Sequence, residues 1–233
     1  MFHTIFFLPL YNALVVLTGL LGGSLGLAVI GLTLLVKLIL APLSHKSIVS
    51  QIEQKKLQPL VDDLRKKYPD QKEQSQKLME LYKEHKTNPF AGCLLILLQL
   101  PVIIALYRVF LAGATIVPES LYSFVHAPAM VNTVFLGLDM SAKSIILAIL
   151  AGISQFAQMY YSPAMQTPET KPDTSDMQGA MMANMQKSMK YTMPIMITLF
   201  AYAVPGAVAL YWIVSNLTMI AQEQFILRKT KTQ

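Results

Sequence analysis

Long runs of apolar residues, separated by shorter polar stretches, dominate the pattern along this chain. A helix that crosses a bilayer needs about 20 consecutive, mostly apolar residues. The run from Tyr191 to Leu227 is too long for one crossing, and Pro205-Gly206 near its middle is a turn signal, so a helical pair is expected there. The pattern therefore predicts five membrane spans, at residues 24–43, 89–112, 142–161, 191–205 and 206–227.

The outer-side N-terminal segment, residues 1–23, predicts a helix of a different kind. Leu8, Tyr11 and Leu14 fall near helical spacing, and Gly22 begins a glycine pair that ends the pattern. We expect a short amphipathic helix that lies in the membrane interface and then turns into the first span.

Residues 44–88 carry two amphipathic stripes. Apolar residues recur at three- and four-residue steps from Ile48 to Leu64, as on one face of a helix, and Pro69 interrupts the pattern before a shorter stripe begins at Leu78. Because two such helices can bury their stripes only against each other, we expect an antiparallel helical hairpin in the cytosol. Two interpretations stay open: a solvated structural hairpin, and a docking arm for cytosolic partners.

Composition supports the membrane interpretation. Of the 233 residues, 54% are apolar and 14% are charged, whereas a soluble domain has about 25% charged residues. Disordered chains are poor in apolar residues, so disorder is excluded as well. The single cysteine, Cys93, excludes a disulfide framework. The expected fold class is all-α, a polytopic membrane protein.

The positive charges indicate the orientation. Of the 19 Lys and Arg residues, ten lie in residues 44–88, three in residues 162–190 and three in the basic tail at residues 228–233, whereas the outer loop at residues 113–141 carries none. Loops rich in Lys and Arg stay in the cytosol, so we expect the N-terminus outside and the C-terminus in the cytosol. Acidic residues interleave with the basic ones, so the net charge of +6 does not indicate a nucleic-acid surface.

Lys37 is a cation inside the first predicted span. In one interpretation its long side chain snorkels to the cytosolic headgroups near Pro42. In the other it lies in a hydrated cavity, because it shares a helical face with small and polar residues that a lipid-facing surface does not need. These residues are Gly22, Gly26, Thr33 and Ser44.

The other spans also carry polar side chains, which one shared wet cavity would explain together. No span places an acid opposite Lys37, because Glu223 lies near the cytosolic end of the last span. An uncompensated cation in a wet cavity attracts acidic or polar segments of a passing chain. The candidate groove residues are Lys37, Thr33, Gln99, Gln155, Tyr211, Trp212, Ser215 and Asn216.

The cytosolic loop at residues 162–190 is rich in methionine, at four-residue steps from Met177 to Met189. Three interpretations stay open: a helix leading into the fourth span, an adaptable apolar surface for varied partners, and a row of soft ligands for copper(I). The chain contains no HExxH, GxSxG or Walker motif and no paired intramembrane aspartates. We therefore expect no catalytic residues and no cofactor.

Four strings, in this order, resemble the YidC/Oxa family of membrane protein insertases: TLLVKLILAPLSHKS, KLQPLVDDLRKKYPD, LMELYKEHKTNPFAGCLLILLQLPVIIALYRVF and PGAVALYWIVSNLTMIAQEQFI. The resemblance covers the chain from about Pro9 to Leu227. It implies five core helices around a hydrophilic groove that opens to the cytosol and to lipid and is closed on the outer side.

The resemblance also implies roles for residues. Lys37 takes the place of the arginine that is usual in the groove, and this exchange keeps the charge but loses the planar fork of donors. Gln99 matches a groove glutamine, and Tyr211, Trp212 and Asn216 match the polar-aromatic part of the last helix.

By the same resemblance the protein is a non-catalytic insertase and chaperone that takes nascent hydrophobic segments into the bilayer. Its implied partners are nascent membrane proteins and lipid, and through the hairpin and tail the ribosome, the signal recognition particle system and the Sec translocon. A minimal bacterial form in the plasma membrane is expected, since neither a large outer domain nor a transit peptide is seen. The alternatives are a small-solute or copper(I) transporter and a purely structural assembly factor.

Overall fold

The computed structural model describes residues 3–68, 70–85, 87, 99–100, 102–105, 107–110, 118–162 and 177–231, and this part of the chain is mostly helical. Most of the second predicted span and residues 163–176 of the methionine-rich loop lie outside the described residues. The elements are η1 (His3–Phe7), α1 (Leu8–Leu20), α2 (Leu25–Lys67), α3 (Gln71–Glu84), η2 (Pro118–Ser120), β1 (Val134–Phe135), β2 (Leu138–Asp139), α5 (Ile145–Tyr161), α6 (Met177–Ala203) and α7 (Gly206–Lys231). Helical turns also cover most of residues 99–110.

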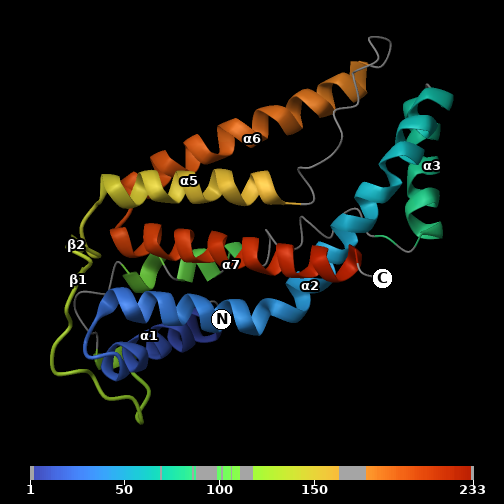
Figure 1. Cartoon of the computed structure of the whole chain (residues 1–233). Coiled ribbons are helices and arrows are strands. Elements are labelled where there is room, and N and C mark those ends of the chain that lie inside the picture. Colours follow the sequence, from blue (N-terminus) through green and yellow to red (C-terminus); the bar gives the residue numbers. More distant parts are fainter. Residues whose placement is uncertain are drawn as a thin grey trace.

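The N-terminal helix α1 packs alongside α2 (Figure 1). The chain reverses at Gly22 and Gly23, which both have positive φ, a conformation that favours glycine. Helix α2 then begins behind Ser24, whose hydroxyl accepts a hydrogen bond from the Leu27 N–H. The segment His3–Leu20 is itself long and apolar enough to cross a bilayer, so the interfacial position of this helix stays a prediction.

Helix α2 continues past residue 43, where the first predicted span ends. It has 43 residues and continues through Pro42 and Pro59 to Lys67. At about 1.5 Å per residue it is about 65 Å long, roughly twice the thickness of a hydrocarbon core. A proline removes one helical hydrogen bond and bends a helix without having to end it, and α2 bends between its two halves (Figure 1). The first predicted span and the first helix of the hairpin are therefore one element.

Helix α7 lies between α2 and α5, and α6 covers α5 (Figure 1). The main apolar core fills the space between α1, α2, α5 and α7, with Leu32, Ala151, Val208 and Ala209 at most 2% exposed. The opposite face of α2, which includes Leu38 and Ile39, is exposed. A helix with one apolar face buried and a second apolar face exposed is typical of a bundle surrounded by lipid.

The segment from residue 118 to residue 144 ties the helix ends together at the end of the bundle that is far from α3 (Figure 1). The buried side chain of Asn12 donates to the Ser120 carbonyl at 2.9 Å and accepts from the Tyr122 N–H at 2.8 Å. The Ala207 N–H at the start of α7 donates to the Met140 carbonyl at 2.8 Å. These bonds cross-link α1 and α7 through one loop, so this end of the bundle is a fixed structure.

The prediction that the two hairpin helices bury only each other is wrong for the first turns. Ile48 and Ile52 on α2 pack against Ile226 on α7, where Ile48 is 0% and Ile226 is 3% exposed. This contact arises because α2 and α7 run side by side past the apolar core. Only the later part of α2, beyond this contact, lies with α3 as a hairpin (Figure 1).

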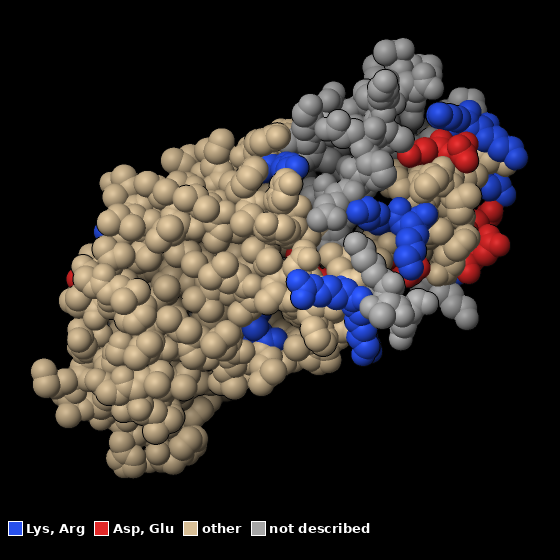
Figure 2. Space-filling view, in the orientation of Figure 1, with Lys and Arg blue, Asp and Glu red and all other residues tan. Residues whose placement is uncertain are grey.

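Charged side chains gather at the end of the molecule formed by α3 and the ends of α2 and α7, and the rest of the visible surface is almost free of charge (Figure 2). Two described segments, His3–Leu20 and Leu25–Leu64, are long and apolar enough to cross a bilayer, and α5 is a shorter apolar helix. Five spans and their orientation remain predictions.

The contact between α5 and α6 makes a first testable prediction. A Cβ at Gly152 would overlap the Thr198 hydroxyl and lie 3.2 Å from the Pro194 carbonyl oxygen. Gly152→Ala is therefore expected to separate the helices and lower the free energy of unfolding by about 1–3 kcal/mol. Gly31→Ala is the control, since the nearest atoms to its Cβ would be the side chains of Leu17 at 3.6 Å and Leu21 at 3.8 Å, both ordinary contact distances. Thermal unfolding in detergent measures both, and equal melting temperatures would contradict the prediction.

Candidate functional site

Lys37 lies on the face of α2 that turns toward the bundle interior. The neighbouring positions on this face, Thr33 and Ser44, are buried, whereas Leu38 on the opposite face is 72% exposed. Lys37 is half-buried and forms no hydrogen bond or ion pair with any described residue. The Thr33 hydroxyl donates to the Val29 carbonyl of its own helix at 2.6 Å. The cation thus projects from a packed helix face, and the cavity interpretation stays a prediction.

The expectation that no acid faces Lys37 is wrong. Glu223 is 1% exposed and close enough to Lys37 for the two charges to interact, although no direct ion pair forms between them. The sequence placed Glu223 near the cytosolic end of its span, where a carboxylate usually reaches water. Two polar groups of α5 hold it inside instead: the Ser162 hydroxyl donates to Glu223 Oε1 at 3.0 Å, and Gln158 Nε2 donates to it at 3.5 Å.

A line of hydrogen bonds joins α5 and α7. Trp212 Nε1 donates to Gln155 Oε1 at 3.0 Å, and Gln155 Nε2 donates to Gln158 Oε1 at 3.4 Å, from which the line continues to Glu223. In parallel, Asn216 Nδ2 donates to Ser154 Oγ at 3.0 Å. The interface between α5 and α7 is therefore polar over several turns.

A second polar set lies on the adjoining face of α7. Gln99 Nε2 donates a hydrogen bond to the hydroxyl of Tyr211, and Ser215 is buried one turn later on the same face. Further along, Gln222 Nε2 donates to Ser44 Oγ of α2 at 2.7 Å. This face joins α7 to α2 and to the helical turns around residue 99.

Hydrogen bonds thus join four of the eight candidate residues in two pairs, Trp212 with Gln155 of α5 and Tyr211 with Gln99. Asn216 bonds to Ser154 of α5, and Ser215 is buried on the same face of α7 as Tyr211. No hydrogen bond among the described residues links Lys37 or Thr33 to either set.

Sequence reasoning missed Glu223, Gln158 and Ser162 as members of the site. The helical spacing of Trp212, Asn216 and Glu223 on one face of α7 is visible in the sequence, but the position of Glu223 near the cytosolic end of its span kept it out of the candidate set.

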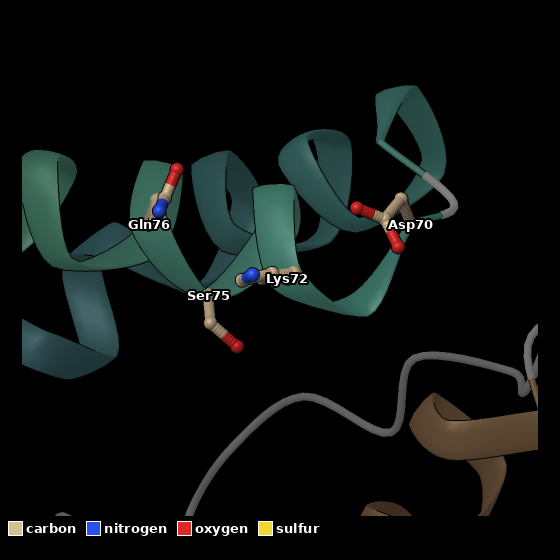
Figure 3. Close-up of a pocket in the computed structure, with 4 residues that line it drawn as sticks. All are labelled: Asp70, Lys72, Ser75 and Gln76. Atoms are coloured by element: carbon tan, nitrogen blue, oxygen red, sulfur yellow. The ribbon is translucent and has the colours of Figure 1, made fainter.

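A separate hollow lies at the start of α3, lined by Asp70, Lys72, Ser75 and Gln76 (Figure 3). Its side chains point in different directions and do not converge on one point (Figure 3). This hollow belongs to the exposed hairpin and is not connected with the polar sets of the bundle.

Comparison with known proteins decides the family. Residues 16–233 match the sequence profile of the 60Kd inner membrane protein family. The chain belongs to this family. The resemblance to YidC/Oxa insertases that the four strings carry is thereby confirmed.

Two curated relatives in the 60Kd inner membrane protein family differ in length. A membrane protein insertase YidC of Haemophilus influenzae (strain PittEE) is 37% identical over 223 residues, which are 94% of this chain and 36% of that protein. A membrane protein insertase YidC of Fusobacterium nucleatum is 35% identical over 208 residues, which are 89% of this chain and 88% of that protein. The chain therefore spans about a third of the first relative and most of the second.

A solved structure agrees with this family. The active YidC insertase crystal structure with the first transmembrane domain resolved superposes with a TM-score of 0.62 and 28% sequence identity, over 94% of this chain and 45% of that chain. None of these relatives is a transporter, so the transporter alternative has no support.

Proposed function

We propose that this protein is a membrane protein insertase that takes nascent hydrophobic segments into the bilayer through a hydrophilic groove and assists their folding. The observation that carries the proposal is the placement of Lys37 on the inner face of α2, next to helix α7, which is polar on two faces. Membership of the 60Kd inner membrane protein family supports the same function. The candidate groove residues are those expected from the sequence, joined by Glu223 and Gln158.

The proposed mechanism is physical and forms no covalent intermediate. A hydrated groove shortens the path through bare hydrocarbon, so the polar outer segment of a substrate crosses part of the membrane in contact with water and polar side chains. Its apolar segment then partitions into lipid, with a gain on the order of several kcal/mol per span. The exposed apolar faces of α2 and α5 support a lipid-facing exit.

The proposed topology has five spans around this groove, with the N-terminus outside and the C-terminus in the cytosol of a bacterial plasma membrane. The collection of charge at the α3 end supports this orientation (Figure 2). The cross-linked loop at the opposite end, held by Asn12, supports a closed outer side. The hairpin and basic tail would then face the ribosome, the signal recognition particle system or the Sec translocon.

Site-directed photocrosslinking to a nascent single-span protein in native membranes tests the groove. Probes at Thr33, Lys37, Gln99 and Tyr211 are expected to capture the nascent chain. A probe at Leu38 is the matched control, because this residue is next to Lys37 but faces outward, with 72% of its side chain exposed. Equal capture from Leu38 and Lys37 would contradict a groove on the inner face of α2.

Reconstitution tests the activity itself. Purified protein in phosphatidylcholine vesicles is expected to raise the protease-protected fraction of an added single-span substrate above that of protein-free vesicles. No increase would overturn the proposed function, whatever the crosslinks show.

A further inference from the structure

Glu223 is the one acidic or basic side chain in the described part of the chain that is almost completely buried. Its Oε1 accepts hydrogen bonds from Ser162 and Gln158, whereas its Oε2 has no hydrogen-bond partner among the described residues. An ionised carboxylate can accept about four hydrogen bonds, and leaving part of this capacity unused in a buried place is costly. Such an atom in a folded protein calls for an explanation.

The contacts that Glu223 makes do not explain its charge. A glutamine at this position has a carbonyl oxygen that could accept the same hydrogen bonds from Ser162 and Gln158. This packing therefore does not require a negative charge. The cation whose charge acts on Glu223 is Lys37 of α2, which forms no ion pair with it and no hydrogen bond or ion pair with any other described residue.

Lys37 of α2 and Glu223 of α7 thus interact through their charges without an ion pair, where the Gln222–Ser44 hydrogen bond joins the two helices. Negative charge at Glu223 reduces the positive potential around the Lys37 ammonium, and so weakens its attraction for acidic segments. The same negative charge makes the potential of the groove more favourable for basic segments.

We propose that Glu223 sets the charge preference of the groove by offsetting the positive charge of Lys37. This inference rests on the proposed function and adds a specificity-determining residue to it. Without Glu223 the groove would favour acidic outer tails strongly; with Glu223 it also handles neutral and basic ones.

The test uses the full chain in phosphatidylcholine vesicles and three single-span substrates whose short outer tails carry net charges of about −2, 0 and +2. Glu223→Gln is expected to raise the insertion rate of the acidic tail relative to the neutral one by about fivefold and to lower that of the basic tail by a similar factor. Glu223→Asp keeps the charge and is expected to retain the wild-type preference. Glu119→Gln is the matched control, since it removes one exposed carboxylate near the other end of the bundle.

The outcomes separate this inference from the proposed function. If the unaltered protein inserts the neutral tail but Glu223→Gln leaves both ratios unchanged, the inference is overturned and the insertase proposal stands. An equal shift in Glu119→Gln would also overturn it, because net charge alone would then be the cause. If Glu223→Gln does not fold, the double variant Lys37→Ala with Glu223→Gln is compared with Lys37→Ala alone. A lower insertion rate of the acidic tail relative to the neutral tail in Lys37→Ala alone supports the inference. Equal ratios in the two variants overturn it. No insertion by the unaltered protein overturns both proposals.

Discussion

Lys37→Ala is expected to slow the insertion of substrates with acidic outer tails by about tenfold relative to neutral tails. The variant removes the cation on the inner face of α2 and leaves Glu223 as the nearest charge, so the acidic tail meets repulsion where it met attraction. Two unit charges about 8 Å apart interact by about 2 kcal/mol at an effective dielectric constant near 20, and about 1.4 kcal/mol corresponds to tenfold. Lys37→Arg keeps the charge and is expected to keep the rate.

The same variant is expected to lower stability. From the sequence alone, loss of an intramembrane cation would only make the first span more apolar. Because Glu223 is buried, Lys37→Ala leaves a carboxylate without its compensating charge, and the double variant with Glu223→Gln should recover the melting temperature.

The control for the Lys37 experiments is Lys143→Ala, which removes an exposed cation just before α5. It is expected to change neither the insertion rates nor the melting temperature. If Lys37→Ala inserts acidic tails as fast as Lys143→Ala does, the charge of Lys37 has no role in handling substrates, and the snorkelling interpretation is favoured.

The helices and the two faces of α7 could be read from the sequence because both depend on local periodicity. Helix α6 ends at Ala203 and α7 begins at Gly206, on either side of the proline where the turn was expected. Helical spacing puts Tyr211 and Ser215 on one face of α7 and Trp212 and Asn216 on the next, which agrees with the hydrogen bonds of Tyr211, Trp212 and Asn216.

The depth of a residue in the bundle and the register between neighbouring helices could not be predicted from local periodicity. Helices α5 and α7 run in parallel, and their polar contacts join residues that are 57 to 65 positions apart in the sequence. This register carries Glu223 to the end of α5, where it is enclosed. Hydropathy places a residue along its own helix but says nothing about the neighbour at the same depth.

The extent of α2 was missed for a related reason. Pro42 is a frequent helix terminator in sequence patterns, but a helix supported by neighbours on one side tolerates a proline with a bend. The contact of Ile48 and Ile52 with α7 supplies such support just beyond the proline.

This contact divides the hairpin into a dispensable part and a structural part. Removing residues 57–84 and joining the ends with a flexible linker is expected to leave a folded core, because Ile48 and Ile52 stay packed on Ile226. Removing residues 46–84 also strips these two isoleucines from α7 and is expected to lower the free energy of unfolding by about 3–6 kcal/mol, at about 1.5–3 kcal/mol for each buried side chain. Thermal unfolding of the purified deletion variants in detergent measures the difference.

Point variants separate lost packing from the effect of the deletion itself. Ile48→Ala is expected to destabilise the protein by about 2–5 kcal/mol, since this side chain is 0% exposed in the contact with α7. Leu60→Ala on the same helix is the matched control; its side chain is 45% exposed, so a change within about 0.5 kcal/mol is expected. The contrary result is that both alanine variants have the melting temperature of the unaltered protein and both deletion variants have equally stable cores. In that case α7 does not depend on α2 beyond Pro42, and the whole hairpin is an independent arm, as its amphipathic pattern first indicated.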